Sequence, residues 1–193
     1  MPNGPDNRGK QALFEEVAMS HFSGIYYAAL RLTGNQSDAE DLVQETFARA
    51  YGSFGSFTLG TNARAWLYKI MNITFLTNIG RAEARYTRAF SATPPERLAG
   101  VRDPASPDPA EVVIANTLDS RLSAALAGLS VEMRSTVVIV DVGGFSYEEA
   151  SQILGCPVGT VRSRLFRGRS ALRTQLTEGA TELMSDPMEG QHE

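Results

Sequence analysis

The chain has 193 residues, 42% of them hydrophobic, which is enough apolar side chain to fill one large domain or two small ones. Its apolar runs are only a few residues long and its first residues are polar, so we expect no membrane span, no secretion signal and a cytoplasmic protein. The single cysteine, Cys156, excludes an internal disulfide and lacks the companion ligands of a zinc site, so no metal and no cofactor are expected.

The formal net charge of −4 is unevenly distributed along the chain. Five arginines and no acidic residue lie between Pro157 and Arg173, and five basic residues against one glutamate lie between Arg64 and Arg88. Residues 178–193 carry five acidic residues and no lysine or arginine, and we expect this tail to be disordered. Because phosphate binding depends on local clusters, the sequence allows two separate surfaces for nucleic acid.

The N-terminal half is predicted to be helical. Apolar residues recur at helical spacing over 13–18 and again over 25–32, and Gly34 ends the second pattern. Ser37 and Glu40 have the spacing of a capping box, which predicts that the next helix begins there.

This next helix is amphipathic, with an apolar side and a second side that carries Asp41 and Glu45. A further helix is expected to begin near Asn62 and to direct Trp66 inward. Trp66 is therefore predicted to be a core residue rather than a residue that stacks on DNA.

A proline-rich segment divides the chain. Five of the nine prolines fall between Ser91 and Glu111, so that segment cannot hold a long helix. We interpret residues 91–111 as a linker between a domain at 10–90 and a second domain at 112–177.

The second domain is also predicted to be helical. Leucines recur at helical spacing over 118–129. The β-branched run Thr136–Val140 favours a strand by propensity, but no partner strand is apparent and we predict a helix. A capped helix over 146–154, a tight turn at Gly155 and an arginine-rich helix over about 157–176 form a helix-turn-helix pattern.

The last helix has the two sides that a DNA-reading helix needs. Val161, Leu165 and Leu172 form an apolar stripe, and a second group of residues faces outward. Arginine can pair with guanine and phenylalanine can touch a thymine methyl group, so the outward residues are candidates for DNA binding. They are Arg162, Ser163, Phe166, Arg167 and Arg169, and Thr160 at the helix N-terminus is a candidate for binding a phosphate. The alternative is a merely solvated helix in a protein with 16 arginines and two lysines.

Three segments resemble motifs of one known family, and they occur in the same order as in that family. Residues 145–169 closely resemble region four of the extracytoplasmic-function sigma factors of the sigma-70 family. Residues 38–47 resemble the polymerase-binding helix of their region two, and residues 65–70 resemble the start of their promoter-melting helix. The resemblance covers about residues 10–175.

The resemblance implies an all-α fold of two small helical domains, sigma region two and region four, joined by a flexible linker. It implies an alternative sigma factor, not an enzyme, that binds core RNA polymerase and directs promoter recognition. Asp41, Gln44 and Glu45 would contact the clamp helices of the largest polymerase subunit. An anti-sigma factor is a further expected partner.

The resemblance also assigns the DNA contacts. The last helix would read the minus-thirty-five element, and the basic segment would hold the minus-ten element through Arg64, Lys69, Asn72, Arg81 and Arg85. The family commonly has asparagine seven residues after the helix tryptophan, where this chain has Ile73. Either Asn72 replaces that asparagine through a local shift, or the protein selects a different minus-ten sequence.

Two other classes of protein remain as alternatives. A regulator with a helix-turn-helix output domain, such as a LuxR-type activator, would explain the second domain but not residues 38–47 or the helix of Trp66. An enzyme is disfavoured because His21 and His192 are isolated and no Walker loop, HExxH motif or nucleophile elbow occurs.

Overall fold

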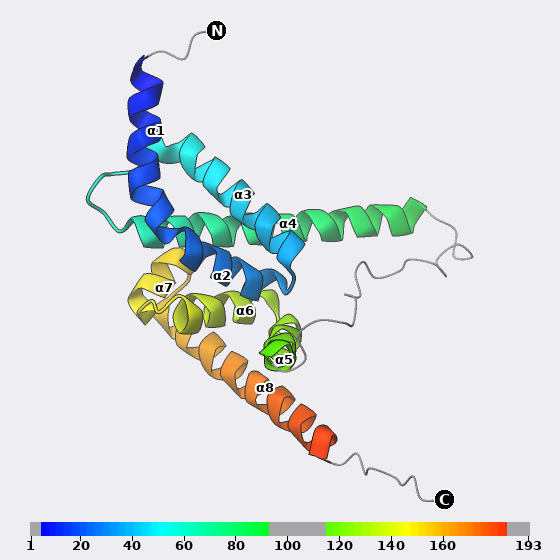
Figure 1. The fold of residues 1–193 in the computed structure, drawn as a ribbon. Coiled ribbons are helices and arrows are strands. Elements are labelled where there is room, and N and C mark those ends of the chain that lie inside the picture. The colour runs from blue at the N-terminus through cyan, green and yellow to red at the C-terminus, as the bar shows by residue number, and fades with distance from the viewer. Residues whose placement is uncertain (1–4, 93–114, 185–193) are drawn as a thin grey trace, which may run out of the picture.

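The computed structural model describes residues 5–92 and 115–184, and every regular element in these two ranges is helical (Figure 1). The helices of each range form one domain, which confirms the predicted all-α class with two helical domains. Most of the predicted linker lies outside the described residues. Within the two ranges, no helix is both long enough and apolar enough to cross a membrane.

The N-terminal domain holds four helices and two short 3₁₀ turns. These elements are α1 (Pro5–Ala18), η1 (Met19–His21), α2 (Phe22–Thr33), α3 (Gln36–Ser53), η2 (Phe54–Ser56) and α4 (Ala63–Ala92). The residues that fill the domain's core come from α2, α3 and α4 and are almost completely buried: Ile25, Ala28, Ala29, Leu32, Ala39, Leu42, Val43, Leu67, Tyr68 and Met71.

The junction between α2 and α3 differs from the prediction. The helix α2 ends at Gly34, whose φ of 82° lies in the left-handed region that glycine adopts without strain. Asn35 then caps α3, because its Oδ1 accepts a hydrogen bond from the backbone N–H of Asp38 at 2.9 Å. The predicted capping box at Ser37 is wrong, since the N-cap is Asn35, two residues earlier, and Ser37 already lies in the first turn of α3.

The start of α4 is as predicted. Asn62 Oδ1 accepts a hydrogen bond from the backbone N–H of Ala65 at 2.9 Å and caps the helix. Trp66 is half-buried, and its ring lies 4.6 Å from the ring of Phe57 and 6.3 Å from that of Phe54, centroid to centroid. Trp66 therefore packs against the protein itself, as expected.

The C-terminal domain contains four α-helices and a π-helical turn. They are α5 (Ala115–Ala127), α6 (Val131–Val137), η4 (Val138–Val142, the π turn), α7 (Tyr147–Leu154) and α8 (Val158–Met184). Since α8 runs past its predicted end at residue 176, the acidic tail expected from residue 178 begins inside this helix. The rest of that tail lies outside the described residues.

The β-branched segment Thr136–Val140 is helical, which confirms the prediction. All five of its residues are buried, so core packing outweighs the strand propensity of the run. The helix widens here, because the backbone N–H of Gly143 donates to the Val138 carbonyl at 2.8 Å, five residues back.

The helix-turn-helix is formed as predicted. Ser146 and Glu149 complete a capping box, with Glu149 N–H donating to Ser146 Oγ at 3.2 Å and Ser146 N–H donating to Glu149 Oε2 at 2.9 Å. α7 ends at Gly155, whose φ is 65°. Val161 and Leu165 on α8 are buried against the rest of the domain.

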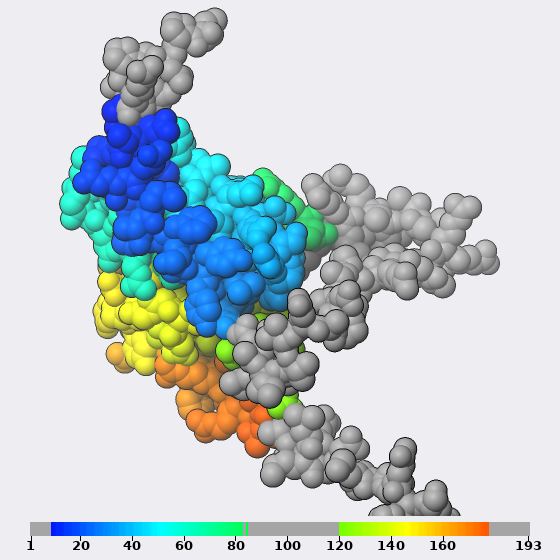
Figure 2. All heavy atoms as spheres, viewed as in Figure 1, coloured from blue at the N-terminus to red at the C-terminus, as the bar shows by residue number. Residues whose placement is uncertain are grey.

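The two domains pack directly against each other (Figure 2). The guanidinium of Arg64 on α4 lies 4.4 Å from the ring centroid of Phe145 and 5.4 Å from that of Tyr68. It also donates to the backbone carbonyl of Gly143. The rings of Tyr68 and Phe145 meet edge to face, 4.8 Å apart. Arg64 thus joins the start of α4 to the loop before α7.

A second arginine fastens the interface from the other domain. Arg134 on α6 donates to the Leu32 carbonyl near the end of α2 at 2.8 Å, and to the Ala127 carbonyl at the end of α5 at 2.8 Å. Burial lowers the pKa of this guanidinium. In addition, Arg31 on α2 donates to Ser123 Oγ on α5 at 3.3 Å. Side chains from both domains therefore hold the interface closed.

Candidate functional site

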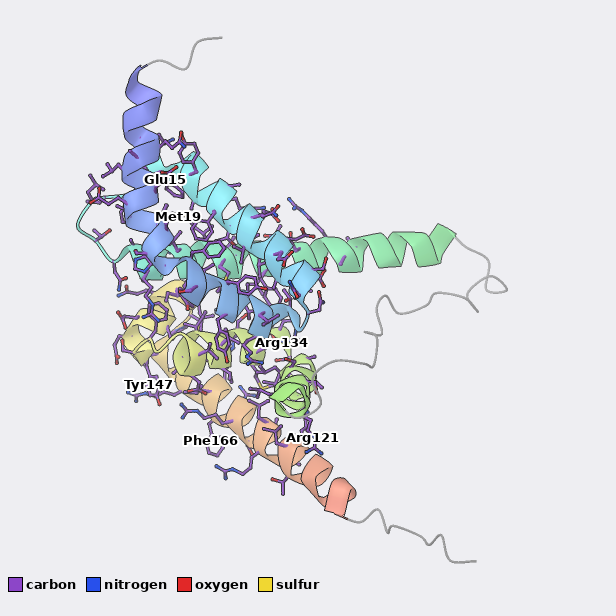
Figure 3. The ribbon with its side chains drawn as sticks, viewed as in Figure 1. Glu15, Met19, Arg121, Arg134, Tyr147 and Phe166 are labelled. Atoms are coloured by element: carbon purple, nitrogen blue, oxygen red, sulfur yellow. The ribbon has the colours of Figure 1, made fainter. Side chains whose placement is uncertain are left out.

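The outer side of α8 gathers four of the residues predicted to bind DNA. Arg162, Ser163, Phe166 and Arg167 are exposed, and Phe166 is 76% exposed, more than any other large hydrophobic residue of the described chain. Figure 3 shows Phe166 projecting from α8 away from the body of the domain. Thr160, in the first turn of the same helix, is half-buried.

Local contacts order this outer side. Ser163 Oγ donates to the Thr160 carbonyl at 3.0 Å, and Arg167 Nε donates to the Ser163 carbonyl at 3.3 Å. The guanidinium of Arg162 lies 5.8 Å from the ring centroid of Tyr147, the first residue of α7. Tyr147 is absent from the predicted set, because nothing in the sequence shows that α7 brings its ring beside Arg162.

The structure separates Arg169 from this group. Its guanidinium forms two hydrogen bonds to the Asp141 carboxylate, from Nε to Oδ2 at 3.1 Å and from Nη2 to Oδ1 at 2.5 Å. The hydrogen bond to Asp141 raises the pKa of Arg169. Arg169 therefore joins α8 to η4, and its charge is paired with a carboxylate 28 residues earlier in the chain.

Glu45, predicted to bind polymerase, is held inside the N-terminal domain. Its carboxylate accepts hydrogen bonds from Asn78 Nδ2 at 2.9 Å and from Arg49 Nη2 at 2.6 Å. Arg81, predicted to bind DNA, lies 3.7 Å from the same carboxylate. The hydrogen bond from Asn78, followed by that from Arg49, lowers the pKa of Glu45. Glu45 and Arg81 are thus partners of each other.

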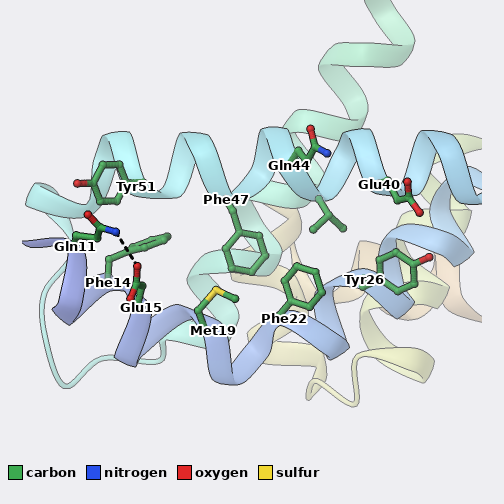
Figure 4. A pocket seen from close by; sticks show the side chains of 11 residues that line it. Gln11, Phe14, Glu15, Met19, Phe22, Tyr26, Glu40, Gln44, Phe47 and Tyr51 are labelled. Atoms are coloured by element: carbon green, nitrogen blue, oxygen red, sulfur yellow. Dashed lines mark hydrogen bonds between the residues drawn. The ribbon is translucent and has the colours of Figure 1, made fainter.

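The two other residues predicted to bind polymerase, Asp41 and Gln44, are exposed on α3. Beside them, a groove of about 810 Å³ separates α3 from α1, η1 and α2 (Figure 4). Its apolar lining is Phe14, Met19, Phe22, Tyr26, Val43, Phe47 and Tyr51, and its polar lining is Gln11, Glu15, Glu40 and Gln44.

Sequence patterns did not reveal this groove, because its two walls are separated in the sequence. The signal that could have indicated it is an excess of aromatic residues on the flanking helices. Phe22 is 42% exposed although its ring lies 5.6 Å from that of Phe47. The groove is therefore an apolar surface that the fold leaves uncovered within the described residues.

The five residues predicted to bind the minus-ten element lie in different surroundings. Arg64 is in the domain interface, and Arg81 faces Glu45. Lys69 is exposed. Asn72 is only 3% exposed, and its Oδ1 has no hydrogen-bond partner in the described structure. Arg85 belongs to α4, but its side chain lies outside the described residues.

Comparisons with known proteins agree with both domains. The family described as Sigma-70 region 2 matches residues 17–85, and Sigma-70, region 4 matches residues 119–172. The chain is 39% identical over 181 residues to the ECF RNA polymerase sigma factor SigE of Mycolicibacterium smegmatis, covering 92% of this chain and 68% of that protein. It is 31% identical over 175 residues to the ECF RNA polymerase sigma factor SigW of Bacillus subtilis, covering 89% and 92%.

A solved structure has the same fold. The sigma factor RpoE of Bartonella quintana, crystallised with the anti-sigma factor NepR, superimposes with a TM-score of 0.67 at 27% identity, covering 85% of this chain and 96% of that one. The chain therefore belongs to the ECF sigma factors of the sigma-70 family. Its function is that of a sigma factor in promoter recognition by RNA polymerase. A LuxR-type activator is set aside, because that alternative left residues 38–47 and the helix of Trp66 unexplained, and both fall in the segment that matches Sigma-70 region 2.

Proposed function

We propose that this sigma factor reads the minus-thirty-five element with the outer side of α8, formed by Arg162, Ser163, Phe166 and Arg167. The observation that carries the proposal is the phenyl ring of Phe166, 76% exposed beside two exposed arginines. In a major groove, the arginines can pair with guanine, and Phe166 can touch a thymine methyl group. Thr160, at the helix N-terminus, would contact a phosphate.

The groove beside α3 suits core polymerase as a partner. Its floor is apolar, and Glu15 and Glu40 add negative charge to its edge. A basic, amphipathic helical partner would bury apolar surface there and complement that charge. We assign this role to the clamp helices of the largest polymerase subunit, with Asp41 and Gln44 as the polar contacts. Glu45 would act through its hydrogen bonds to α4, by fixing the position of α3.

The minus-ten element is assigned to α4. Lys69 is exposed and can meet a phosphate in the present arrangement. Arg64 would become available only when the domains separate, and Arg81 would share its charge between Glu45 and DNA. Asn72 would remain a core residue unless the neighbouring helices move.

Three general parts of the proposal rest on membership of the sigma-factor family. The protein supplies binding energy to promoter opening and has no catalytic step of its own. It works in the cytoplasm, where polymerase and promoter are. By analogy with the Bartonella quintana sigma factor that was crystallised with NepR, an anti-sigma factor regulates it.

Arg167→Ala tests the role of α8. We expect the variant, assembled with core polymerase, to bind duplex containing the minus-thirty-five element more weakly by about 1–3 kcal/mol, as for the loss of a bidentate contact to a base. Arg173→Ala, an exposed arginine farther along α8, is the matched control and should change affinity much less. An equal loss on scrambled DNA would mean that Arg167 contacts only phosphate.

A further inference from the structure

One side of α4 carries an exposed aliphatic stripe. Lys69, Ile73, Leu76 and Gly80 follow one another at steps of three and four residues, so they share one side of the helix. Ile73 is 48% exposed and Leu76 is 42% exposed. Ile73 and Leu76 together form a small exposed apolar surface on this side of α4.

Four polar side chains between residues 70 and 80 could form hydrogen bonds to a DNA base, but none of them lies on the exposed stripe. Asn72 is 3% exposed. The other three donate hydrogen bonds within the fold, namely Thr74 to the Ile70 carbonyl (2.8 Å), Thr77 to the Ile73 carbonyl (2.7 Å) and Asn78 to Glu45 Oε2 (2.9 Å). Between residues 69 and 80, the exposed stripe therefore presents aliphatic groups and a single ammonium group.

The charge around the stripe selects a polyanion as its occupant. No aspartate or glutamate occurs between residues 62 and 82, and Lys69 begins the stripe. Arg81, with a side chain 60% exposed, follows the end of the stripe and lies 3.7 Å from the Glu45 carboxylate of α3, so it can share its charge between Glu45 and a phosphate. Phosphates can meet these cations while unstacked bases meet the aliphatic side chains. A melted DNA strand offers both groups at once, whereas an intact duplex buries its base faces.

We propose that Ile73 and Leu76 select a thymine of the melted minus-ten strand through apolar contact with its 5-methyl group. This inference rests on the proposed role of α4 in minus-ten binding. It decides between the two explanations that the sequence leaves open for Ile73. Because Asn72 is buried, it does not replace the family's asparagine, and the chain reads a different base by a different kind of contact.

The test uses the holoenzyme reconstituted with core polymerase and promoter probes whose minus-ten strand is already unpaired. Each thymine of that strand is replaced in turn by deoxyuridine, which removes only the methyl group. We expect one replacement to weaken binding by the wild-type protein roughly three- to fivefold, the effect of burying one methyl group. Ile73→Ala should bind the thymine and deoxyuridine probes equally.

Two control variants isolate the aliphatic contact. Lys69→Ala should weaken binding to both probes by the same factor, because it removes a phosphate contact and leaves the methyl contact intact. Leu59→Ala removes an aliphatic side chain that is 56% exposed but lies outside α4, and it should behave as the wild type. Ile73 is exposed, so Ile73→Ala should keep the wild-type melting temperature.

The outcomes separate the inference from the proposed function. If Lys69→Ala weakens binding but no deoxyuridine probe differs from thymine, α4 binds DNA and the methyl contact is wrong. If neither Lys69→Ala nor Ile73→Ala changes binding, the role of α4 itself is wrong. If Asn72→Ala and not Ile73→Ala removes the base preference, asparagine reads the base and the inference is overturned. If replacing thymine by deoxyuridine weakens binding to a fully paired duplex just as much, the assignment to a melted strand is overturned.

Discussion

Glu149 connects local helix capping with the packing of the two domains. Its carboxylate accepts a hydrogen bond from the backbone N–H of Ser146 and another from Asn62 Nδ2 of the other domain, at 3.3 Å. The hydrogen bond from the Ser146 backbone, followed by that from the Ser146 side chain, lowers the pKa of this carboxyl. The charged form of Glu149 is therefore favoured in the folded chain.

The lowered pKa predicts an acid-dependent loss of stability. The contribution of Glu149 is fully present above its unfolded pKa of about 4.3 and is lost as the pH falls through the lower folded pKa. We expect Glu149→Gln to lose less unfolding free energy than the wild type between pH 6 and pH 3, as measured by urea denaturation at each pH. Glu148→Gln, on the same turn of α7, is the control. Identical pH profiles for Glu149→Gln and the wild type would contradict this reading.

The helix α8 combines the side proposed to bind DNA with a close approach to α6 on another side. Gly168 is buried, and a Cβ atom placed on it would lie 2.8 Å from Val137 Cγ2. Val137 is itself buried and β-branched, so its methyl group has little freedom to move. In contrast, a Cβ at Gly159, in the first turn of α8, would meet no atom within 4 Å.

These two glycines give opposite predictions for the same substitution. Gly159→Ala should raise the free energy of unfolding by about 0.5–1 kcal/mol, because alanine restricts the unfolded chain and favours the helix. Gly168→Ala should lower it by about 1–3 kcal/mol, because the added methyl group overpacks the contact with α6. Urea denaturation of both variants measures the difference. A higher free energy of unfolding for both variants would show that α8 can move away from α6 at little cost in stability.

The packing of the two domains conflicts with the promoter contacts proposed for α4 and α8, if both are made at once. The minus-ten and minus-thirty-five elements are centred about 25 base pairs apart, or about 85 Å along a duplex that rises about 3.4 Å per pair. Here α7 of the helix-turn-helix contacts α4. We therefore expect the domains to separate when the protein binds polymerase and promoter.

Removing one interface arginine tests this expectation. Arg64→Ala loses the stacking on Phe145 and the hydrogen bond to the Gly143 carbonyl. We expect a larger radius of gyration in small-angle scattering of the free protein, while helix content measured by circular dichroism stays unchanged. Lys69→Ala, an exposed cation on the same helix, is the matched control. A radius equal to that of the wild type would mean that Arg64 does not hold the domains together.

Local patterns in the sequence predicted most of the helices and their ends. Asn62, the Ser146–Glu149 box and the glycines at 34 and 155 act within a few residues of themselves, so their effect can be recognised from spacing alone. The capping box at Ser37 was wrong because Asn35, two residues earlier, caps the helix through the backbone N–H of Asp38 and so places Ser37 inside the first turn. The π turn in the valine-rich run was also beyond prediction, since it depends on how the surrounding core packs.

The sequence by itself determined the family, the all-α class and which helix sides carry charge, because these follow from periodicity and from motifs of contiguous residues. Only the tertiary structure decided which charged residues remain available. Arg169 meets Asp141, Arg81 meets Glu45 and Arg64 meets the Gly143 carbonyl, and each pair is separated by 28 or more residues in the chain. Electrostatic pairing depends on distance in space, so no local pattern could reveal these contacts. Lys69, Ile73, Phe166 and Arg167 stay exposed within the described structure.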